Sequence, residues 1–259
     1  MVTFALVGFL LGWLWTRLYL PGALRAADVV KAIAQDVLDK QQAADAKALA
    51  LVNRVLAPPP GAPPVSQEEA TEAIKAASPP TQVQIFERAR GTRLDCLERA
   101  REAQKAKQDS RRTEALASME RTALIFRALI AADDENKFHR NHGQLAFVLK
   151  DKRPPDWPAA EAEFTRAISI RGDARTQGYW VYELGRATCL IYLDQALFAQ
   201  EPPVRSSPAQ RERIVNDLRV AVQLGGVDQL DTDADQDIRD GIRTWMRANG
   251  VSPEDLTAT

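Results

Sequence analysis

Residues 157–173, with the sequence WPAAEAEFTRAISIRGD, contain a regular pattern of apolar side chains. Trp157, Ala160, Phe164 and Ala167 recur at intervals of three, four and three, which places them on one face of a helix. Alanine at two of these positions lets a neighbouring helix approach closely. The pattern predicts a helix that packs against other helices, and the sequence around it indicates a repeat.

The composition of the whole chain predicts an all-α fold. Glycine is sparse among the 259 residues, good helix formers are plentiful, and alternating β-branched runs are hard to find. The 34 basic and 35 acidic side chains nearly cancel, which argues against nucleic acid as a partner. Cys96 and Cys189 have no metal-like or redox-like spacing and favour a reducing compartment, with a long-range disulfide as the alternative.

Residues 1–25 are expected to form a membrane anchor. The run from 4 to 15 is entirely apolar, and the apolar segment continues to residue 20, which is long enough to cross a bilayer. A cleaved signal peptide or a buried core helix is the alternative, but no basic residue precedes the run and no small-residue cleavage site follows it. Because Arg17, Arg25 and Lys31 follow the run, we expect a single-pass membrane protein whose soluble domain faces the cytoplasm.

Small residues recur every four positions in this anchor, at Gly8, Gly12 and Thr16. The spacing resembles the glycophorin dimer motif and predicts self-association into a homodimer. Two ordinary glycines in a membrane helix are the alternative.

Residues 26–56 are expected to form one amphipathic helix, because apolar residues alternate at intervals of three and four without glycine or proline. The seam consists of Val30, Ile33, Val37, Ala44, Ala48, Leu51 and Val55. It fits a surface helix folded back on the domain as well as a parallel coiled-coil stalk. The proline-rich residues 57–65 are expected to form an extended linker.

Residues 66–114 are expected to be the helical beginning of the soluble domain. Two capping boxes, Ser66 with Glu69 and Thr81 with Gln84, predict helix starts. The mixed charges of residues 92–112 are typical of a solvated helix face.

Residues 115–250 contain helix pairs separated by proline-rich or acidic turns, and residues 251–259 are expected to be a flexible tail. The first pair has Gly143 in its first helix and Trp157, Ala160, Phe164 and Ala167 in its second. The next pair has Leu184 and Gly185, then Ile214, Leu218 and Ala221.

This order of residues resembles the tetratricopeptide repeat, a stacked helix-turn-helix with the signature W-x2-L-G-x2-Y followed by A-x3-F. We expect the glycine to let the two helices of a pair approach closely, and the alanines to let the next pair pack closely against them. The sequence departs from the family where His139 and Val181 replace tryptophan and Ala146 and Thr188 replace tyrosine. An irregular helical bundle is the alternative.

The resemblance implies a concave groove lined by one face of each first helix. Basic residues on that face hold an acidic segment or a terminal carboxylate of a peptide in such proteins, and arginine and tyrosine suit that contact. The corresponding positions are Lys137, Arg140, Gln144, Tyr179, Tyr182 and Arg186. A solvated polar face is the alternative.

Catalytic signatures are missing from the sequence, which contains neither a phosphate-binding glycine loop nor a G-x-S-x-G or H-E-x-x-H motif. His139 and His142 lie three apart, yet His142 shares an apolar helical stripe with Phe138, Leu145 and Leu149 and is expected to be structural. The aspartates of residues 231–237 imitate a calcium loop, but Gln236 occupies its glycine position. We therefore expect neither a metal nor a cofactor.

The resulting hypothesis is a membrane-anchored scaffold or adaptor that recruits a protein partner through the groove, without catalysis of its own. Two alternatives stay open. One is a self-assembling structural membrane component, driven by the anchor and the 26–56 helix. The other is a helical enzyme or regulatory subunit whose site the sequence does not reveal.

Overall fold

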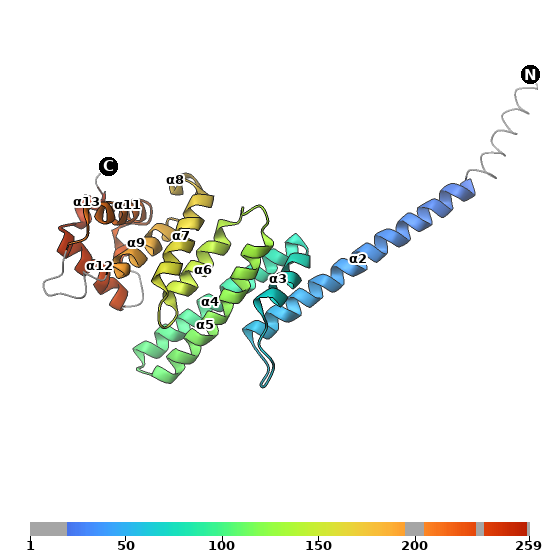
Figure 1. Cartoon of the computed structure of the whole chain (residues 1–259), viewed down its shortest axis with the longest axis horizontal. Coiled ribbons are helices and arrows are strands. Elements are labelled where there is room, and N and C mark those ends of the chain that lie inside the picture. Colours follow the sequence, from blue (N-terminus) through green and yellow to red (C-terminus); the bar gives the residue numbers. More distant parts are fainter. Residues whose placement is uncertain (1–19, 195–204, 232–235, 258–259) are drawn as a thin grey trace, which may run out of the picture.

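A computed structural model describes residues 20–194, 205–231 and 236–257, and within these ranges the chain forms helices and no strand (Figure 1). The all-α class is therefore confirmed. The helices are α2 (Leu20–Leu56), α3 (Gln67–Ala76), α4 (Pro79–Lys105), α5 (Asp109–Ala132), α6 (His139–Asp151), α7 (Trp157–Arg171), α8 (Ala174–Gln177), α9 (Val181–Leu193), α11 (Pro208–Gly225), the 3-10 turn η2 (Val227–Asp231), α12 (Gln236–Asn249) and α13 (Pro253–Thr257).

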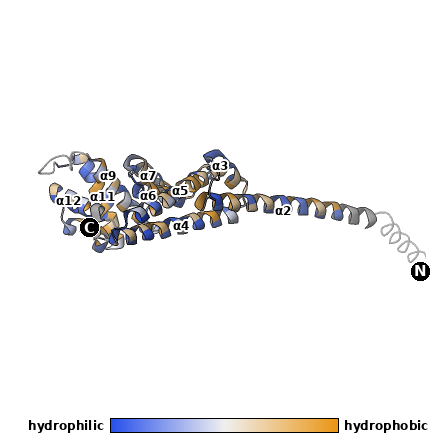
Figure 2. Cartoon of the chain, turned by 90° about the horizontal axis from the view of Figure 1, so that it is seen from below, coloured by the Kyte–Doolittle hydropathy of each residue, from blue (hydrophilic) through white to orange (hydrophobic). Residues whose placement is uncertain are grey.

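Helix α2 is one continuous rod that runs through the expected boundary at residue 25. Residues 28–40 are all exposed, and this part of α2 projects away from the other helices (Figures 1 and 2). Further along, Leu51, Val52 and Val55 are buried where α2 packs against α3, α4 and α5. The C-terminal half of the helix thus lies on the domain, whereas its N-terminal half leaves the apolar seam uncovered.

The junction between α3 and α4 is fixed to α2 by Asp45. One carboxylate oxygen of Asp45 accepts a hydrogen bond of 2.7 Å from the backbone N–H of Ser78, and the other accepts one of 2.7 Å from the Ser78 hydroxyl. Ser78 is the N-cap of α4, and proline occupies the first turn, where its fixed backbone angle suits a helix. The expected capping box at Thr81 does not form, because α4 begins two residues before it and Thr81 lies inside the helix.

Three helical hairpins follow one another along the chain. Helix α4 packs along α5, α6 along α7, and α9 along α11, while α5 against α6 and α7 against α9 join each hairpin to the next (Figure 1). Helices α12 and α13 pack at the far end, against α9 and α11 respectively. Figure 2 shows the same series from another side, with α2 extending from one end.

The face seen in the opening stretch does form the core of α7. Ala160, Phe164 and Ala167 are completely buried, and Trp157 is half-buried and stacks on Tyr192 with ring centroids 4.6 Å apart. The corresponding α11 residues are also buried. They are Ile214, Leu218 and Ala221.

Gly143 and Gly185 bring consecutive hairpins together. A Cβ on Gly143 of α6 would lie 2.3 Å from the ring of Tyr182 on α9, and one on Gly185 of α9 would lie 2.3 Å from the ring of Phe164 on α7. The sequence predicts that these glycines let the two helices within one pair approach closely. In the structure they allow close contact between neighbouring pairs, because the ring that lies against each glycine belongs to the neighbouring hairpin.

No helix in the described ranges is long and apolar enough to cross a membrane. Residues 1–19, most of the expected anchor, lie outside those ranges, as do Gly8, Gly12 and Thr16. The anchor and its self-association stay predictions.

Candidate functional site

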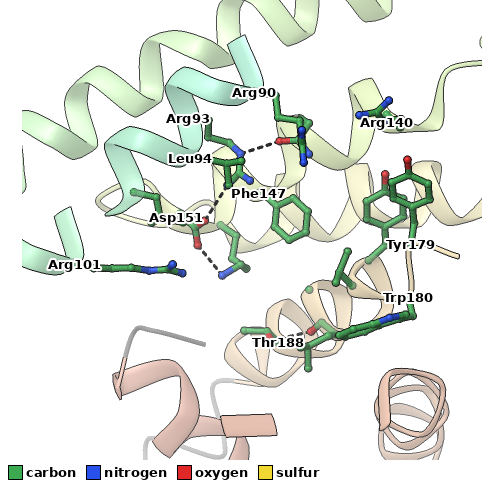
Figure 3. A pocket seen from close by; sticks show the side chains of 17 residues that line it. Arg90, Arg93, Leu94, Arg101, Arg140, Phe147, Asp151, Tyr179, Trp180 and Thr188 are labelled. Carbon is green, nitrogen blue, oxygen red and sulfur yellow. Dashed lines mark hydrogen bonds and ion pairs between the residues drawn. The ribbon is translucent and has the colours of Figure 1, made fainter. Parts of the chain in front are cut away.

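A cleft of about 420 Å³ lies between the first helices of the three hairpins, α4, α6 and α9 (Figure 3). Each of these helices contributes one wall. The lining residues are Arg90, Arg93, Leu94, Leu97 and Arg101 of α4; Arg140, Gln144, Phe147, Lys150 and Asp151 of α6; and Tyr179, Trp180, Val181, Tyr182, Leu184, Gly185 and Thr188 in and just before α9.

Positive charge dominates this cleft. Five of the lining residues are basic, and Asp151 is the one acidic side chain among them. The whole chain has almost equal numbers of acidic and basic residues, so the excess is local. A concave, one-signed surface of this kind attracts anionic groups and raises their local concentration.

The floor of the cleft carries two buried cations. Arg93 donates from Nε to the side-chain oxygen of Gln144 at 2.8 Å, and its Nη1 lies 3.8 Å from Asp151. The Nζ of Lys150 lies 2.6 Å from the same carboxylate. Burial lowers the pKa of Arg93, but a guanidinium stays protonated in a protein. Asp151 therefore lies close to both cations of the floor.

The rim carries the other three arginines. Arg90 and Arg140 share the carboxylate of Glu87, at 3.2 and 2.9 Å, and the guanidinium of Arg140 also lies over the ring of Phe86 at 4.6 Å. Within the described part of the chain, Arg101 has no carboxylate at ion-pair distance. Arg101 is thus the lining cation best placed to pair with a bound anion.

One side of the cleft is apolar. Leu94 is 40% exposed, and Leu97, Val181 and Leu184 are half-buried in the lining. Trp180 continues this surface and packs against Gly225 of α11, where an added Cβ would lie 2.5 Å from the indole. A ligand can therefore combine anionic groups with apolar contacts.

The two tyrosines differ in accessibility. Tyr182 is 1% exposed, and burial raises the pKa of its hydroxyl well above the ordinary value. Tyr179 is 43% exposed and stacks on Tyr182 with ring centroids 5.8 Å apart. Of the two rings, Tyr179 is the one a ligand can touch.

Four of the six residues expected in the groove line this cleft: Arg140, Gln144, Tyr179 and Tyr182. Gln144 is buried, and its side-chain oxygen already accepts a hydrogen bond from Arg93. The structure places the other two elsewhere. Lys137 pairs with Glu135 and lines a separate cavity of about 500 Å³ beside the end of α5. Arg186 makes two hydrogen bonds of 2.8 and 2.7 Å to Asp217 of α11, which raises the pKa of the guanidinium.

The sequence interpretation missed the α4 wall. We read residues 92–112 as a solvated face, yet Arg93 is buried and Arg101 lines the cleft. A signal was present, since Arg90, Leu94, Leu97 and Arg101 follow at intervals of four, three and four, which is one helix face. The other charged residues of this helix obscure that spacing in the sequence.

The histidines make protein contacts. His142 lies between Glu163, at 2.7 Å, and Asn136, at 3.0 Å. His139 contacts the hydroxyl of Tyr182 at 3.2 Å, and burial, with Arg171 and Arg140 nearby, lowers its pKa. No cluster of three or more metal-ligating side chains occurs in the described ranges. The side chains of residues 231–237 lie outside what the structure describes.

No protein-family model matches the chain, and no significant match was found among curated proteins or solved structures. The resemblance to tetratricopeptide repeats thus stays a hypothesis. The assignment of a function rests on the geometry and charge of the cleft.

Proposed function

We propose that this chain recruits a protein partner by binding an acidic segment of that partner in the cleft between α4, α6 and α9. The excess of five basic side chains over one acidic side chain in the cleft carries the proposal. The location supports it, because the cleft runs across the first helices of three consecutive helical hairpins. An extended peptide fits a concave surface of this kind better than it fits a flat surface.

The chain holds its partner at a membrane in this proposal. Residues 1–25 are the anchor, the exposed part of α2 that follows them is the spacer, and the hairpins face the cytoplasm. The exposed part of α2, residues 28–40, separates the hairpins from the anchor by about 20 Å at about 1.5 Å per residue. The protein acts as a scaffold or adaptor and needs no catalytic group.

A charge reversal tests the cleft. The probe is a fluorescein-labelled nonapeptide of eight glutamates around a central alanine, and the protein is the full chain in detergent micelles. We expect Arg101→Glu to weaken binding about tenfold, or about 1.4 kcal/mol, and added salt to weaken binding to the unchanged protein. Arg88→Glu is the matched control, because Arg88 is exposed on the same helix and does not line the cleft.

Photo-crosslinking in the native host identifies the partner. We place the reactive amino acid at Leu94, which is exposed in the cleft, and at Arg88 as the control. A discrete adduct from position 94 alone is expected. Equal adducts from both positions, or equal peptide binding by the Arg101→Glu and Arg88→Glu variants, would reject the cleft as the docking site.

Self-assembly is the second candidate function, and the uncovered seam of α2 favours it. Val29, Val30, Ile33 and Val37 are each more than half exposed on one face of the helix. A second copy paired along this seam has to diverge before residue 41, where the side chain of Gln41 contacts the end of α3. Light scattering of the full chain and of Ile33→Asp tests it, and an unchanged mass would count against pairing through α2.

A further inference from the structure

The turn that leads into α9 contains an unusual tyrosine. Tyr179 has a φ angle of +58°, in the left-handed region, and follows Gly178 at +74°. A side chain such as tyrosine rarely occupies this region, because its Cβ crowds the following carbonyl oxygen. The conformation persists only where surrounding contacts hold it.

The buried guanidinium of Arg171 provides those contacts. Its Nη1 donates to the carbonyl oxygens of Gly178 at 3.3 Å and Tyr179 at 3.0 Å, and its Nε donates to that of Gly172 at 3.1 Å. The carboxylate of Glu183 pairs with the same guanidinium from the first turn of α9. The turn is thus fixed before any ligand arrives.

Glycine or asparagine would form this turn with less strain. Tyrosine adds only its ring, which lines the cleft mouth and is 43% exposed. The ring contacts Tyr182, His139 and the guanidinium of Arg140, whose charge lies 5.9 Å from the ring centroid. The aromatic surface therefore stands directly beside a rim cation.

We infer that Tyr179 is the specificity-determining contact of the cleft, and that it binds a flat aromatic side chain placed within the acidic segment of the partner. The inference rests on the proposed function. It adds an aromatic side chain to the acidic segment, which the charges of the cleft alone do not specify. Carboxylates of the segment pair with Arg101 and Arg140, while the aromatic side chain lies against Tyr179 and the apolar wall. A fixed ring loses little conformational entropy on contact, which suits a recognition residue.

Two peptides measure the preference on the full chain in detergent. One is the nonapeptide of eight glutamates around a central alanine, and the other has tryptophan in place of the alanine. We expect the tryptophan peptide to bind the unchanged protein about tenfold more tightly, a difference typical of a stacked aromatic pair with its buried area.

Replacement of Tyr179 assigns that preference to its ring. In Tyr179→Gly and Tyr179→Asn we expect the tryptophan preference to vanish and the alanine peptide to bind as before. Because both residues accept a positive φ, the relief of backbone strain should offset the lost ring contacts, and the melting temperature should not fall. Tyr179→Phe keeps the ring and should keep the preference.

Each other outcome overturns the inference. Equal binding of the two peptides by the unchanged protein, or a preference that survives in Tyr179→Gly, removes the aromatic contact but leaves the acidic cleft. Binding of neither peptide by the unchanged protein overturns the proposed function as well. A lower melting temperature in both variants, with the preference intact, would make Tyr179 a packing residue only.

Discussion

Gly143 lies directly against the phenol ring of Tyr182, so that a methyl group on Gly143 would come within 2.3 Å of Cε1 and 2.6 Å of Cζ. The two residues belong to α6 and α9, the first helices of consecutive hairpins. The ring is buried and its hydroxyl contacts His139, so it has little room to move aside. The spacing of α6 and α9, and with it the width of the cleft, depends on this glycine.

Gly143→Ala should therefore destabilise the protein. An overpacked core side chain forces neighbouring rings or helices apart and typically costs about 1–3 kcal/mol of unfolding free energy. Urea denaturation followed by circular dichroism measures the difference.

Gly91→Ala is the matched control, because Gly91 lies within α4 and nothing comes within 4 Å of an added Cβ. Alanine in a helix is favoured over glycine by about 0.5–1 kcal/mol, so this variant should be more stable than the unchanged protein. Equal effects of the two substitutions would show that Tyr182 does not restrict residue 143.

Arg171→Met should lower the free energy of unfolding by more than the loss of an exposed ion pair would. The side chains of Arg171 and Glu183 are 1% and 6% exposed, and the substitution removes the arginine donor from the Glu183 carboxylate and from three backbone carbonyls. Breaking a buried pair from one side typically costs about 3–5 kcal/mol. Chemical denaturation of the full chain in detergent checks the value.

Arg213→Met provides the comparison. Arg213 also pairs with a glutamate, Glu161 at 3.0 Å, but its side chain is largely exposed. Exposed pairs typically contribute about 0–1 kcal/mol. If both variants lost the same stability, burial would not be what makes the Arg171 pair important.

The helices could be predicted from the sequence because each carries its own periodic signal. Ala160, Phe164 and Ala167 follow helical spacing and are buried as expected. The Ser66 cap also formed, with its hydroxyl accepting from the backbone N–H of Glu69 at 3.0 Å. These features depend on residues close in sequence, which a single chain reveals.

The partners of each residue could not be predicted in the same way. Phe138 shares a helical stripe with buried residues, yet it is the N-cap of α6 and is 59% exposed. Arg186 has the spacing of a groove residue, but an aspartate 31 positions later holds it away from the cleft. Such outcomes depend on which helices become neighbours in the fold, and the spacing of residues along one helix does not contain that information.

Asp45 should make stability depend on pH in the acidic range. Hydrogen bonds from Ser78 lower the pKa of this carboxyl from 3.8 to about 2. A carboxyl with a lowered folded-state pKa stabilises the fold above its unfolded value, and this contribution is lost as the pH falls through the folded value. The stabilisation is thus fully present above pH 4 and disappears towards pH 2.

Melting curves of the unchanged protein and of Asp45→Asn between pH 7 and pH 2 test this dependence. The variant should melt at a lower temperature at pH 7, and the gap should close between pH 4 and pH 2. A gap that stays constant over the whole range would mean that Asp45 acts by shape and not by charge.

Neither cysteine should react with a thiol reagent in the folded protein. Cys96 and Cys189 are both free and completely buried. Burial raises the pKa of Cys189 to about 12, so the reactive thiolate is scarce at pH 8. Ellman's reagent should therefore find no thiol in the native chain and two after unfolding in guanidinium.

Leu94→Cys shows whether the reagent reaches the cleft. Residue 94 is exposed there, so the variant should release one equivalent of chromophore within minutes while the two native thiols stay silent. An acidic nonapeptide bound in the cleft should slow that reaction and leave the unfolded total of three thiols unchanged. Fast labelling of Cys189 instead would show that α9 opens from α6 and α7 in solution, and that the cleft is not the fixed surface its buried contacts imply.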